Sequence, residues 1–263
     1  MRKLTTIAAA AAIVLLVTTE ARAQFGRGGP TWTTASADAQ RTASLRTDPQ
    51  INRANVQKGV VEMLWKLKLN NTNQQMNSVT APVITQRIIS YRGFKDPIFL
   101  SGSNDMLLSV DEPLGKVFWE TKMPYQVTYP QVKGGTLACP GGLTSQMSLP
   151  TPLSNNPPPG AARGAAQATP PLTIPARGIF TMPTAVVYGL SSDGLLHSLN
   201  QHTGLDLVPV VKLVRPNANA KGLAVINNVG YVATADECGS AFNGVYALDL
   251  TAQIKALSVV SWL

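Results

Sequence analysis

The stretch SDGLLHSLNQHTG at residues 192–204 has a near-copy, SNDMLLSVDEPLG, at residues 103–115, 89 positions earlier. A third related stretch, VYALDL at 245–250, aligns with LHSLNQ at 196–201 after 49 positions. Self-similarity at such a period is typical of repeat folds, in which a unit cannot bury its apolar side alone and packs against its neighbours. The repeat therefore decides the fold.

Each copy has the pattern of a tight turn, a strand and a second turn. Asn104–Asp105 and Asp193–Gly194 are pairs that accept positive φ, and Asn243–Gly244 does the same one position later. The strand that follows alternates between two faces and ends at a short polar residue, whose side chain can accept hydrogen bonds from the turn backbone. These end residues are Asp111, Asn200 and Asp249.

The period predicts the blades of a β-propeller, which take roughly 40–50 residues each. Residues 148–178 hold eight prolines and two charged residues, and we expect this proline-rich stretch to be a disordered surface insertion that lengthens the first interval. Trp65, Leu67 and Leu69 alternate with polar residues and predict an earlier strand. We therefore expect an all-β, incomplete propeller of four-stranded antiparallel blades, with about three blades plus an N-terminal strand segment.

The first 23 residues predict a secretory signal peptide. Arg2 and Lys3 precede an apolar run from Ile7 to Val17, and a small-x-small cleavage site ends at Ala23. The run is shorter than the about 20 residues of a membrane span, so an uncleaved anchor is the weaker alternative. We expect a periplasmic or secreted protein without a membrane span, in which residues 24–60 lead into repeats at 61–263.

The charge of the chain favours solubility rather than nucleic-acid binding. After removal of the signal, 19 basic residues face 13 acidic ones. The basic residues are scattered singly and no array of aromatic residues accompanies them, so we expect only a general attraction to anionic surfaces.

At SVDEPLGKVFW, residues 109–119, the repeat resembles the tryptophan-docking motif of pyrroloquinoline quinone (PQQ) repeat β-propellers. The first copy matches at Asp111, Gly115, Lys116 and Trp119; the second at Thr203 and Gly204, with Asn200 for the aspartate and Val208 for the tryptophan; the third at Ala247, Asp249 and Trp262. The resemblance covers about residues 32–263 without the insertion. It implies that the indole packs between neighbouring blades. Because the sequence stops within a strand pattern, a truncated member is expected.

Quinoprotein dehydrogenases of this superfamily hold PQQ with Ca²⁺, and the resemblance raises the question of chemistry. This chain has no adjacent cysteine pair and no C-x-x-C-H haem motif. Its repeat aspartates are explained by turns, so we expect no catalytic residue, no metal site and no cofactor, with PQQ and Ca²⁺ reserved for a full-length form. The pair Asp236–Glu237 is either a metal ligand or part of a solvated loop.

The remaining reactive side chains have structural interpretations. Cys139 and Cys238 lie in loops of two successive blades and are predicted to form a disulfide, with free thiols as the alternative. His197 and His202 are expected to be structural, and the sequence indicates no Ser-His-Asp arrangement. Arg92 either lines a central funnel or lies on a surface strand.

Three functions fit these observations. The first is a non-catalytic scaffold that binds a protein partner; the second is part of a quinoprotein dehydrogenase that oxidises an alcohol or sugar; the third is a cell-surface polysaccharide-binding module. The missing cofactor residues favour the first. An open arc of blades also predicts self-association through exposed apolar surface.

Overall fold

The computed structural model describes residues 31–44, 53–59, 62–71, 79–86, 88–102, 105–124, 139, 145–151, 185–251 and 259–262. The predicted signal peptide and most of the proline-rich insertion lie outside the described residues. Nearly all described elements are strands, apart from the short helix α2 (Arg53–Gln57) and the 3-10 turn η1 (Cys238–Ser240). The predicted all-β class is therefore confirmed.

The first sheet is a four-stranded antiparallel meander in the order β1-β4-β5-β6. Its strands are β1 (Val83–Ile84), β4 (Pro97–Gly102), β5 (Met106–Asp111) and β6 (Lys116–Lys122). A hairpin of β2 (Ile88–Ser90) and β3 (Gly93–Lys95) is inserted between β1 and β4 and forms a separate two-stranded sheet.

The second sheet has the order β10-β9-β8, with β8 (Val186–Leu190), β9 (Leu195–Asn200) and β10 (Val211–Lys212). Ser148 pairs with Tyr188 of β8 as a further antiparallel bridge. The insertion predicted at residues 148–178 therefore begins too early, because Met147 and Leu149 are buried in the core and Ser148 pairs with β8. The second sheet has three strands, and this single bridge extends it beyond β8.

The third sheet has the order β14-β13-β12-β11-β7, and its antiparallel meander comprises the first four of these strands. The strands are β7 (Pro150–Thr151), β11 (Asn219–Ile226), β12 (Val229–Ala235), β13 (Gly244–Asp249) and β14 (Val259–Trp262). Strand β7 pairs in parallel with β11 and so links the second sheet to the third. The first and third sheets contain the predicted four-stranded antiparallel meander, whereas the second has three strands and the bridge at Ser148.

The three repeat copies occupy equivalent places in these sheets. Strands β5, β9 and β13 end at Asp111, Asn200 and Asp249, as the alignment predicts. The tight turn predicted at Asn243–Gly244 is wrong, because residues 236–243 connect β12 to β13 through η1. The two residues between β11 and β12, Asn227 and Asn228, both have positive φ and form a tight turn there.

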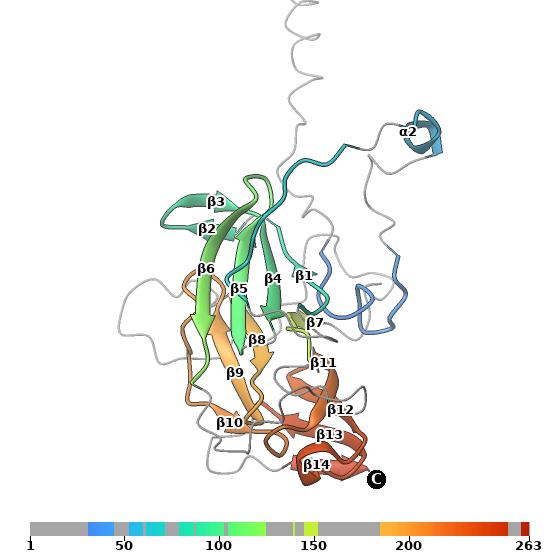
Figure 1. The fold of residues 1–263 in the computed structure, drawn as a ribbon, viewed down its shortest axis with the longest axis vertical. Coiled ribbons are helices and arrows are strands. Elements are labelled where there is room, and N and C mark those ends of the chain that lie inside the picture. Colours follow the sequence, from blue (N-terminus) through green and yellow to red (C-terminus); the bar gives the residue numbers. More distant parts are fainter. Residues whose placement is uncertain are drawn as a thin grey trace, which may run out of the picture.

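The sheets stack face to face (Figure 1). A core that includes Phe99, Leu107, Val187 and Leu199 joins the first sheet to the second, and another that includes Tyr188, Leu196, Val225 and Leu248 joins the second to the third. The far face of the first sheet is covered by Trp65, Leu67 and Leu69, which pack on Leu100, Met106, Leu108 and Val110. These three covering residues alternate in burial as predicted, although the structure assigns no strand to residues 62–69.

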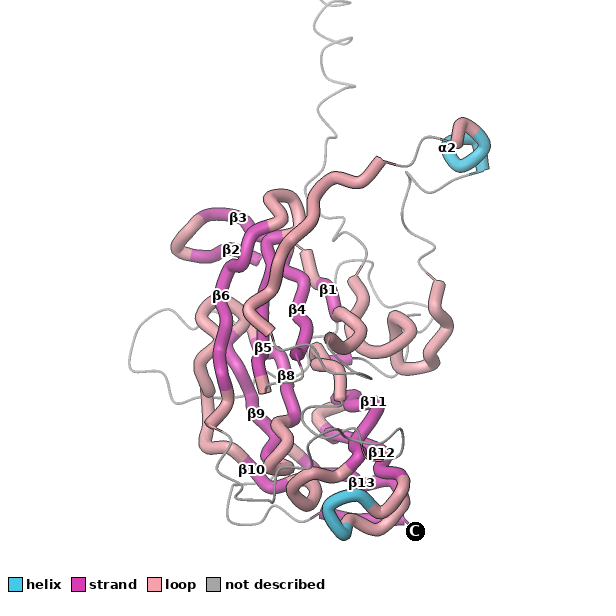
Figure 2. Tube along the Cα trace, viewed as in Figure 1, coloured by secondary structure: helices cyan, strands magenta, loops and turns pink. Residues whose placement is uncertain are grey.

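The N-terminal segment 31–44 is a loop that contacts β1 of the first sheet, Leu149 beside the second sheet and β11 of the third (Figure 2). Trp32 exchanges two 2.8 Å backbone hydrogen bonds with Ile84 of β1, and Thr33 O accepts from Leu149 N at 2.8 Å. At the third sheet, Thr34 Oγ1 donates to Leu223 O at 3.2 Å. The segment that was predicted to lead into the repeats therefore connects the three sheets through hydrogen bonds.

A buried carboxyl group joins the first two sheets. Asp105 accepts a hydrogen bond from Ser192 N at 2.9 Å and another from Ser192 Oγ. Burial raises the pKa of Asp105, and the bonds from Ser192 together with the nearby His197 offset only part of this effect.

The raised pKa has a consequence for stability. In the folded protein the pKa of Asp105 lies above the ordinary value of about 3.9, so the protonated carboxyl group favours folding. This stabilisation is complete at lower pH and is lost as the pH rises through the folded pKa. Asparagine can still accept from Ser192 N and donate to Ser192 Oγ, but carries no charge. We expect Asp105→Asn to unfold at a higher urea concentration than the native chain at pH 7, with the gain shrinking as the pH falls through the folded pKa of Asp105 and absent below about pH 4. A variant less stable than the native chain at pH 7 would show instead that the ionised carboxylate stabilises the fold.

Candidate binding surface

Trp119 of β6 is docked between the first and second sheets. Its side chain is buried, and Nε1 donates to Gln201 O at 2.8 Å, in the turn that follows β9. Gly204 of that turn has a φ of 70°, and a Cβ there would overlap the indole ring. Thr121 Oγ1 also donates to Gly204 O at 2.9 Å. The turn therefore needs glycine both for its backbone conformation and for the approach of the indole.

Trp65 is docked in the same way on the turn that follows β5. Its Nε1 donates to Glu112 O at 2.8 Å, and a Cβ on Gly115 would overlap its indole. Glu112 and Gly115 are the repeat equivalents of Gln201 and Gly204. In each of these two turns, a carbonyl thus accepts a hydrogen bond from a tryptophan of the preceding layer, and a glycine lies against the same indole.

The polar residue before each turn has a different partner in the first copy. Asn200 Oδ1 accepts from His202 N, and Asp249 Oδ1 accepts from Thr251 N, each at 2.8 Å, as predicted. The prediction is wrong for Asp111, because the equivalent position is Pro113, which has no N–H. The carboxylate of Asp111 instead binds Lys95 Nζ at 2.6 Å.

The other motif residues lie at the edges of these turns. Lys116 is exposed at the start of β6, Ala247 is buried in β13, and Thr203 Oγ1 accepts from Leu205 N at 3.4 Å. Val208, in the tryptophan position of the second copy, is half-buried.

Trp262 lies on β14, where the docked tryptophan of the first sheet lies on β6, but it is exposed. The relative exposure of Trp262 is 56%, against 8% for Trp119. Trp262 pairs with Val245 across the strands, and Ala247 pairs with Val260. Because paired residues and alternate residues share a face, these four side chains lie on the face of the third sheet that points away from Leu248 and the core. Ala247 itself is buried. We call Val245, Val260 and Trp262, together with Tyr231 of β12, which pairs with Ala247, the open face.

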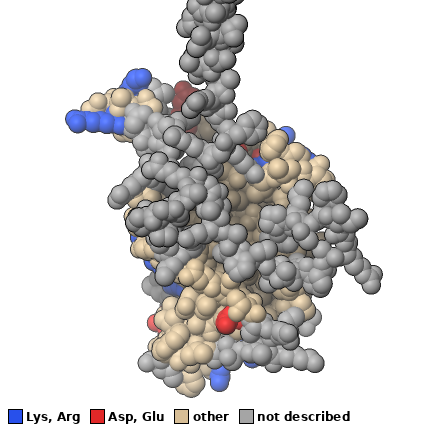
Figure 3. Space-filling view, turned by 180° about the vertical axis from the view of Figure 1, so that it is seen from behind, with Lys and Arg blue, Asp and Glu red and all other residues tan. Residues whose placement is uncertain are grey.

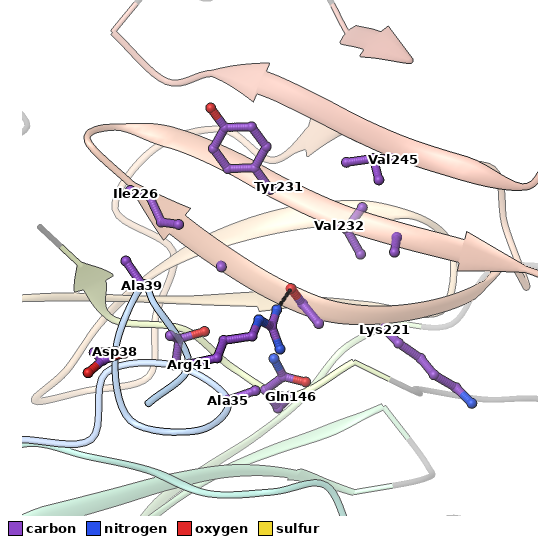
Figure 4. Close-up of a pocket in the computed structure, with 14 residues that line it drawn as sticks. Ala35, Asp38, Ala39, Arg41, Gln146, Lys221, Ile226, Tyr231, Val232 and Val245 are labelled. Carbon is purple, nitrogen blue, oxygen red and sulfur yellow. Dashed lines mark hydrogen bonds between the residues drawn. The ribbon is translucent and has the colours of Figure 1, made fainter. Parts of the chain in front are cut away.

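A groove of about 460 Å³ runs between the open face and the N-terminal segment (Figure 4). Tyr231 and Val245 line it from the sheet, and Ala35, Ala39 and Arg41 line it from the segment. The Arg41 guanidinium donates to Gly222 O at 3.3 Å across the groove. Two cations, Arg41 and Lys221, and one carboxylate, Asp38, also line the groove. An apolar wall with charged residues beside it suits a partner that presents an apolar strand or turn.

The charged residues outside this groove form no single patch on the face shown in Figure 3, where lysine, arginine and acidic side chains are scattered over the described surface. The sequence alone could not find the open face, because Val245 and Val260 read as ordinary strand residues. Trp262 was the one available signal, through its place in the repeat.

The two cysteines form a disulfide in the structure. Cys139 and Cys238 are joined, with their Cα atoms 5.5 Å apart. Cys238 lies in η1, between β12 and β13, so the bond connects the third sheet to the chain that precedes the second.

The structure contains a Ser-His-Asp network that the sequence did not indicate. Ser191 Oγ lies 3.1 Å from His197 Nε2, and His197 Nδ1 lies 3.1 Å from both carboxylate oxygens of Asp206. Asp206 is nine residues beyond His197 and comes alongside by pairing with Leu199. No sequence motif marks this arrangement.

The contacts of this network fit a structural role. A serine nucleophile must give its proton to the histidine, whereas Ser191 Oγ donates to Asp193 and lies 3.1 Å from Leu195 O. Ser191 and His197 are buried, and neither lines the groove. His202, in the next turn, is partly buried, and burial lowers its pKa. The structural roles expected for both histidines fit these contacts.

The sequence left open whether Asp236 and Glu237 bind a metal or lie in a solvated loop. Calcium needs several convergent oxygens, yet no group of three His, Cys, Asp or Glu converges within the described part of the chain. Asp236 instead accepts from Asn219 Nδ2 at 3.0 Å, and Glu237 N donates to Asn243 Oδ1 at 2.9 Å. Among the described residues, none of the helices is long and apolar enough to cross a membrane.

Comparisons with known proteins identify no family for this chain. No protein-family model matches the chain, and no curated protein matches it significantly. Among solved structures, the chain is similar to the quinohemoprotein alcohol dehydrogenase from Comamonas testosteroni, with a TM-score of 0.45 and 18% identity. The similarity covers 84% of this chain and 26% of that enzyme, so the chain spans about a quarter of its length.

Proposed function

We propose that this protein is a non-catalytic, secreted or periplasmic scaffold that binds a protein partner through the open face of its third sheet. The observation that carries the proposal is the contrast between Trp119 and Trp262. Both lie on the last strand of a four-stranded meander, yet one is docked on a turn of the next sheet and the other is exposed.

The two docked tryptophans specify the chemistry of the partner. Each indole N–H donates to the carbonyl one residue after the polar end residue, and each ring lies against a glycine three residues further on. A partner for Trp262 would therefore present a β-sheet whose turn offers a free carbonyl and a glycine. Its apolar side would cover Val245 and Val260, which removes exposed apolar surface from water.

The groove adds a polar contact to this apolar one. Arg41 lines the groove, where its guanidinium donates to Gly222 O. A planar guanidinium forms strong hydrogen bonds with carboxylates, so an acidic side chain on the partner would fix its orientation. The exposed apolar centre with a polar rim is the usual composition of a protein interface.

The two other functions considered from the sequence, a dehydrogenase and a polysaccharide-binding module, have less support among the described residues. For a dehydrogenase, no group of three His, Cys, Asp or Glu side chains among the described residues offers itself as a metal site. For a polysaccharide-binding module, the exposed Trp262 lies on a strand beside aliphatic residues rather than beside other aromatics that could stack on a sugar. Saturable, stoichiometric binding of PQQ with Ca²⁺ to the purified protein would contradict the scaffold proposal.

Photo-crosslinking in the producing cells tests the proposed surface. With p-benzoylphenylalanine in place of Val260, we expect a covalent product whose partner peptide maps to a glycine-containing β-turn, and we expect Trp262→Ala in the same chain to lower its yield at least about tenfold. The matched control carries the crosslinker in place of Leu205, an exposed residue of the second sheet's turn. Equal yields from positions 260 and 205, or a yield unchanged by Trp262→Ala, would overturn the proposal.

A further inference from the structure

The hairpin β2–β3 presents one anchored face and one exposed apolar face. Ile88 pairs with Lys95 and Ile89 with Phe94, so the two pairs point to opposite sides. On the anchored side, Ile88 is buried in the core between the first two sheets and Lys95 binds Asp111. The hairpin stands off the end of the first sheet (Figure 1).

The other side of the hairpin exposes large apolar side chains. The relative exposures of Ile89, Tyr91 and Phe94 are 63%, 75% and 76%. At the turn, the Arg92 guanidinium lies 5.1 Å from the centre of the Tyr91 ring. Arg92 is thus at the tip of this hairpin, and the structure places it on the surface rather than in a funnel.

The turn is held in one conformation by Ser90. Its Oγ accepts from Arg92 N at 3.0 Å and donates to Gly93 O at 2.9 Å, and Gly93 has a φ of 88°. The anchored base and the fixed turn mean that little conformational entropy is lost when the tip is immobilised. A rigid, projecting apolar tip is therefore already arranged for binding.

We propose that this hairpin tip inserts into an anionic lipid surface. Tyrosine and arginine suit the boundary between lipid headgroups and acyl chains, because each has an apolar body and a polar end. Phe94 and Ile89 supply the apolar surface that enters the acyl region, and interfacial segments bury such surface to a depth of about 5–10 Å. A three-residue strand of about 3.3 Å per residue gives this reach.

The charge distribution favours an anionic surface. From Gln24 onward the chain has 19 basic and 13 acidic residues, a net charge of +6, and Arg92 places one positive charge at the tip. The acidic residues Asp96 and Glu112 lie at the base of the hairpin, where Glu112 N donates to Asp96 O at 2.9 Å, and Asp111 is paired with Lys95. A basic group near the headgroups strengthens binding to anionic lipid.

The size of the tip favours a lipid surface over a protein. Three side chains, of which aromatic residues bury about 150–250 Å² each, provide roughly 400–500 Å². A standard protein interface needs about 800 Å² on each partner. Insertion of a small tip into a membrane surface has no such minimum, because lipid surrounds it on all sides.

Vesicle co-sedimentation of the chain from Gln24 onward tests this inference, since the apolar leader is then absent. We expect binding to vesicles that contain phosphatidylglycerol and weaker binding to pure phosphatidylcholine. The double variant Ile89→Ser/Phe94→Ser is expected to lower the partition coefficient by at least about tenfold, because binding scales with the apolar area inserted. Its thermal unfolding midpoint should match the native one, since both side chains are exposed.

The matched control is Phe242→Ser. Phe242 is an exposed phenylalanine with the Arg215 guanidinium 5.8 Å from its ring, so it repeats the aromatic and cationic composition at another site. This variant should bind phosphatidylglycerol vesicles within about twofold of the native chain. Equal losses from both variants, or no vesicle binding by the native chain, would overturn the inference and leave the tip to a protein partner.

Discussion

Replacement of Trp119 by alanine is expected to lower the free energy of unfolding by about 3–5 kcal/mol, the range for buried aromatic residues truncated to alanine. The substitution removes the contact with Phe99, whose ring centre lies 5.8 Å away, and the packing on Gly204. It also removes the hydrogen bond to Gln201 O, which joins two sheets. Urea unfolding followed by circular dichroism measures this loss.

Two further variants separate the contributions at this position. Trp119→Phe keeps most of the apolar surface but cannot donate to Gln201 O, so we expect it to lose only about 1 kcal/mol through the hydrogen bond, plus part of the packing. Trp262→Ala is the matched control, since this exposed tryptophan should change stability by no more than about 0.5 kcal/mol. If Trp119→Ala and Trp262→Ala had equal effects, the two residues could not differ as the structure shows.

Loss of the Cys139–Cys238 bond is expected to destabilise the fold by a similar amount. The bond closes a loop with a sequence separation of 99 residues, and in the chain-entropy model such a crosslink stabilises by about 4–5 kcal/mol. Cys139→Ser and Cys238→Ser should therefore each lower the urea midpoint strongly, as should a reducing agent added to the native chain.

The double variant provides the control for this prediction. Either substitution already removes the crosslink. Cys139→Ser/Cys238→Ser should therefore be no less stable than the less stable of the two single variants. Additive losses would mean that each cysteine stabilises the fold through its own packing. A midpoint unaffected by reduction of the native protein would contradict the role given to the bond.

The fold was predictable because each repeat copy contains its own turn and strand signals. Asp111, Asn200 and Asp249 end equivalent strands as expected, and the Gly115 and Gly204 turns each receive a tryptophan. These features depend on local backbone chemistry, which a short stretch of sequence encodes. The strand predicted at Trp65, Leu67 and Leu69 is wrong, since the structure assigns no strand to residues 62–69, although these three side chains pack on the first sheet.

Other features depend on contacts that no local pattern encodes. Asp206 reaches His197 only because Leu199 pairs with it, and Asp111 turns to Lys95 because a proline occupies the position of the usual donor. Residues 148–151 were assigned to the insertion on their proline content, whereas their burial and their pairing with β8 and β11 keep them in the sheets. The exposure of Trp262 could not be predicted, because it depends on which part of the structure packs beside β14.

Hydrogen exchange of the tryptophan indole N–H groups, followed by NMR after transfer to D₂O, tests the central claim most directly. The chain has four tryptophans, whose signals can be assigned by substitution. Because Trp119 and Trp65 donate to carbonyls of neighbouring turns, their indole N–H signals should persist, whereas that of Trp262 should be lost at once. Loss of the Trp119 signal as rapidly as that of Trp262 would contradict the docking of one sheet on the next.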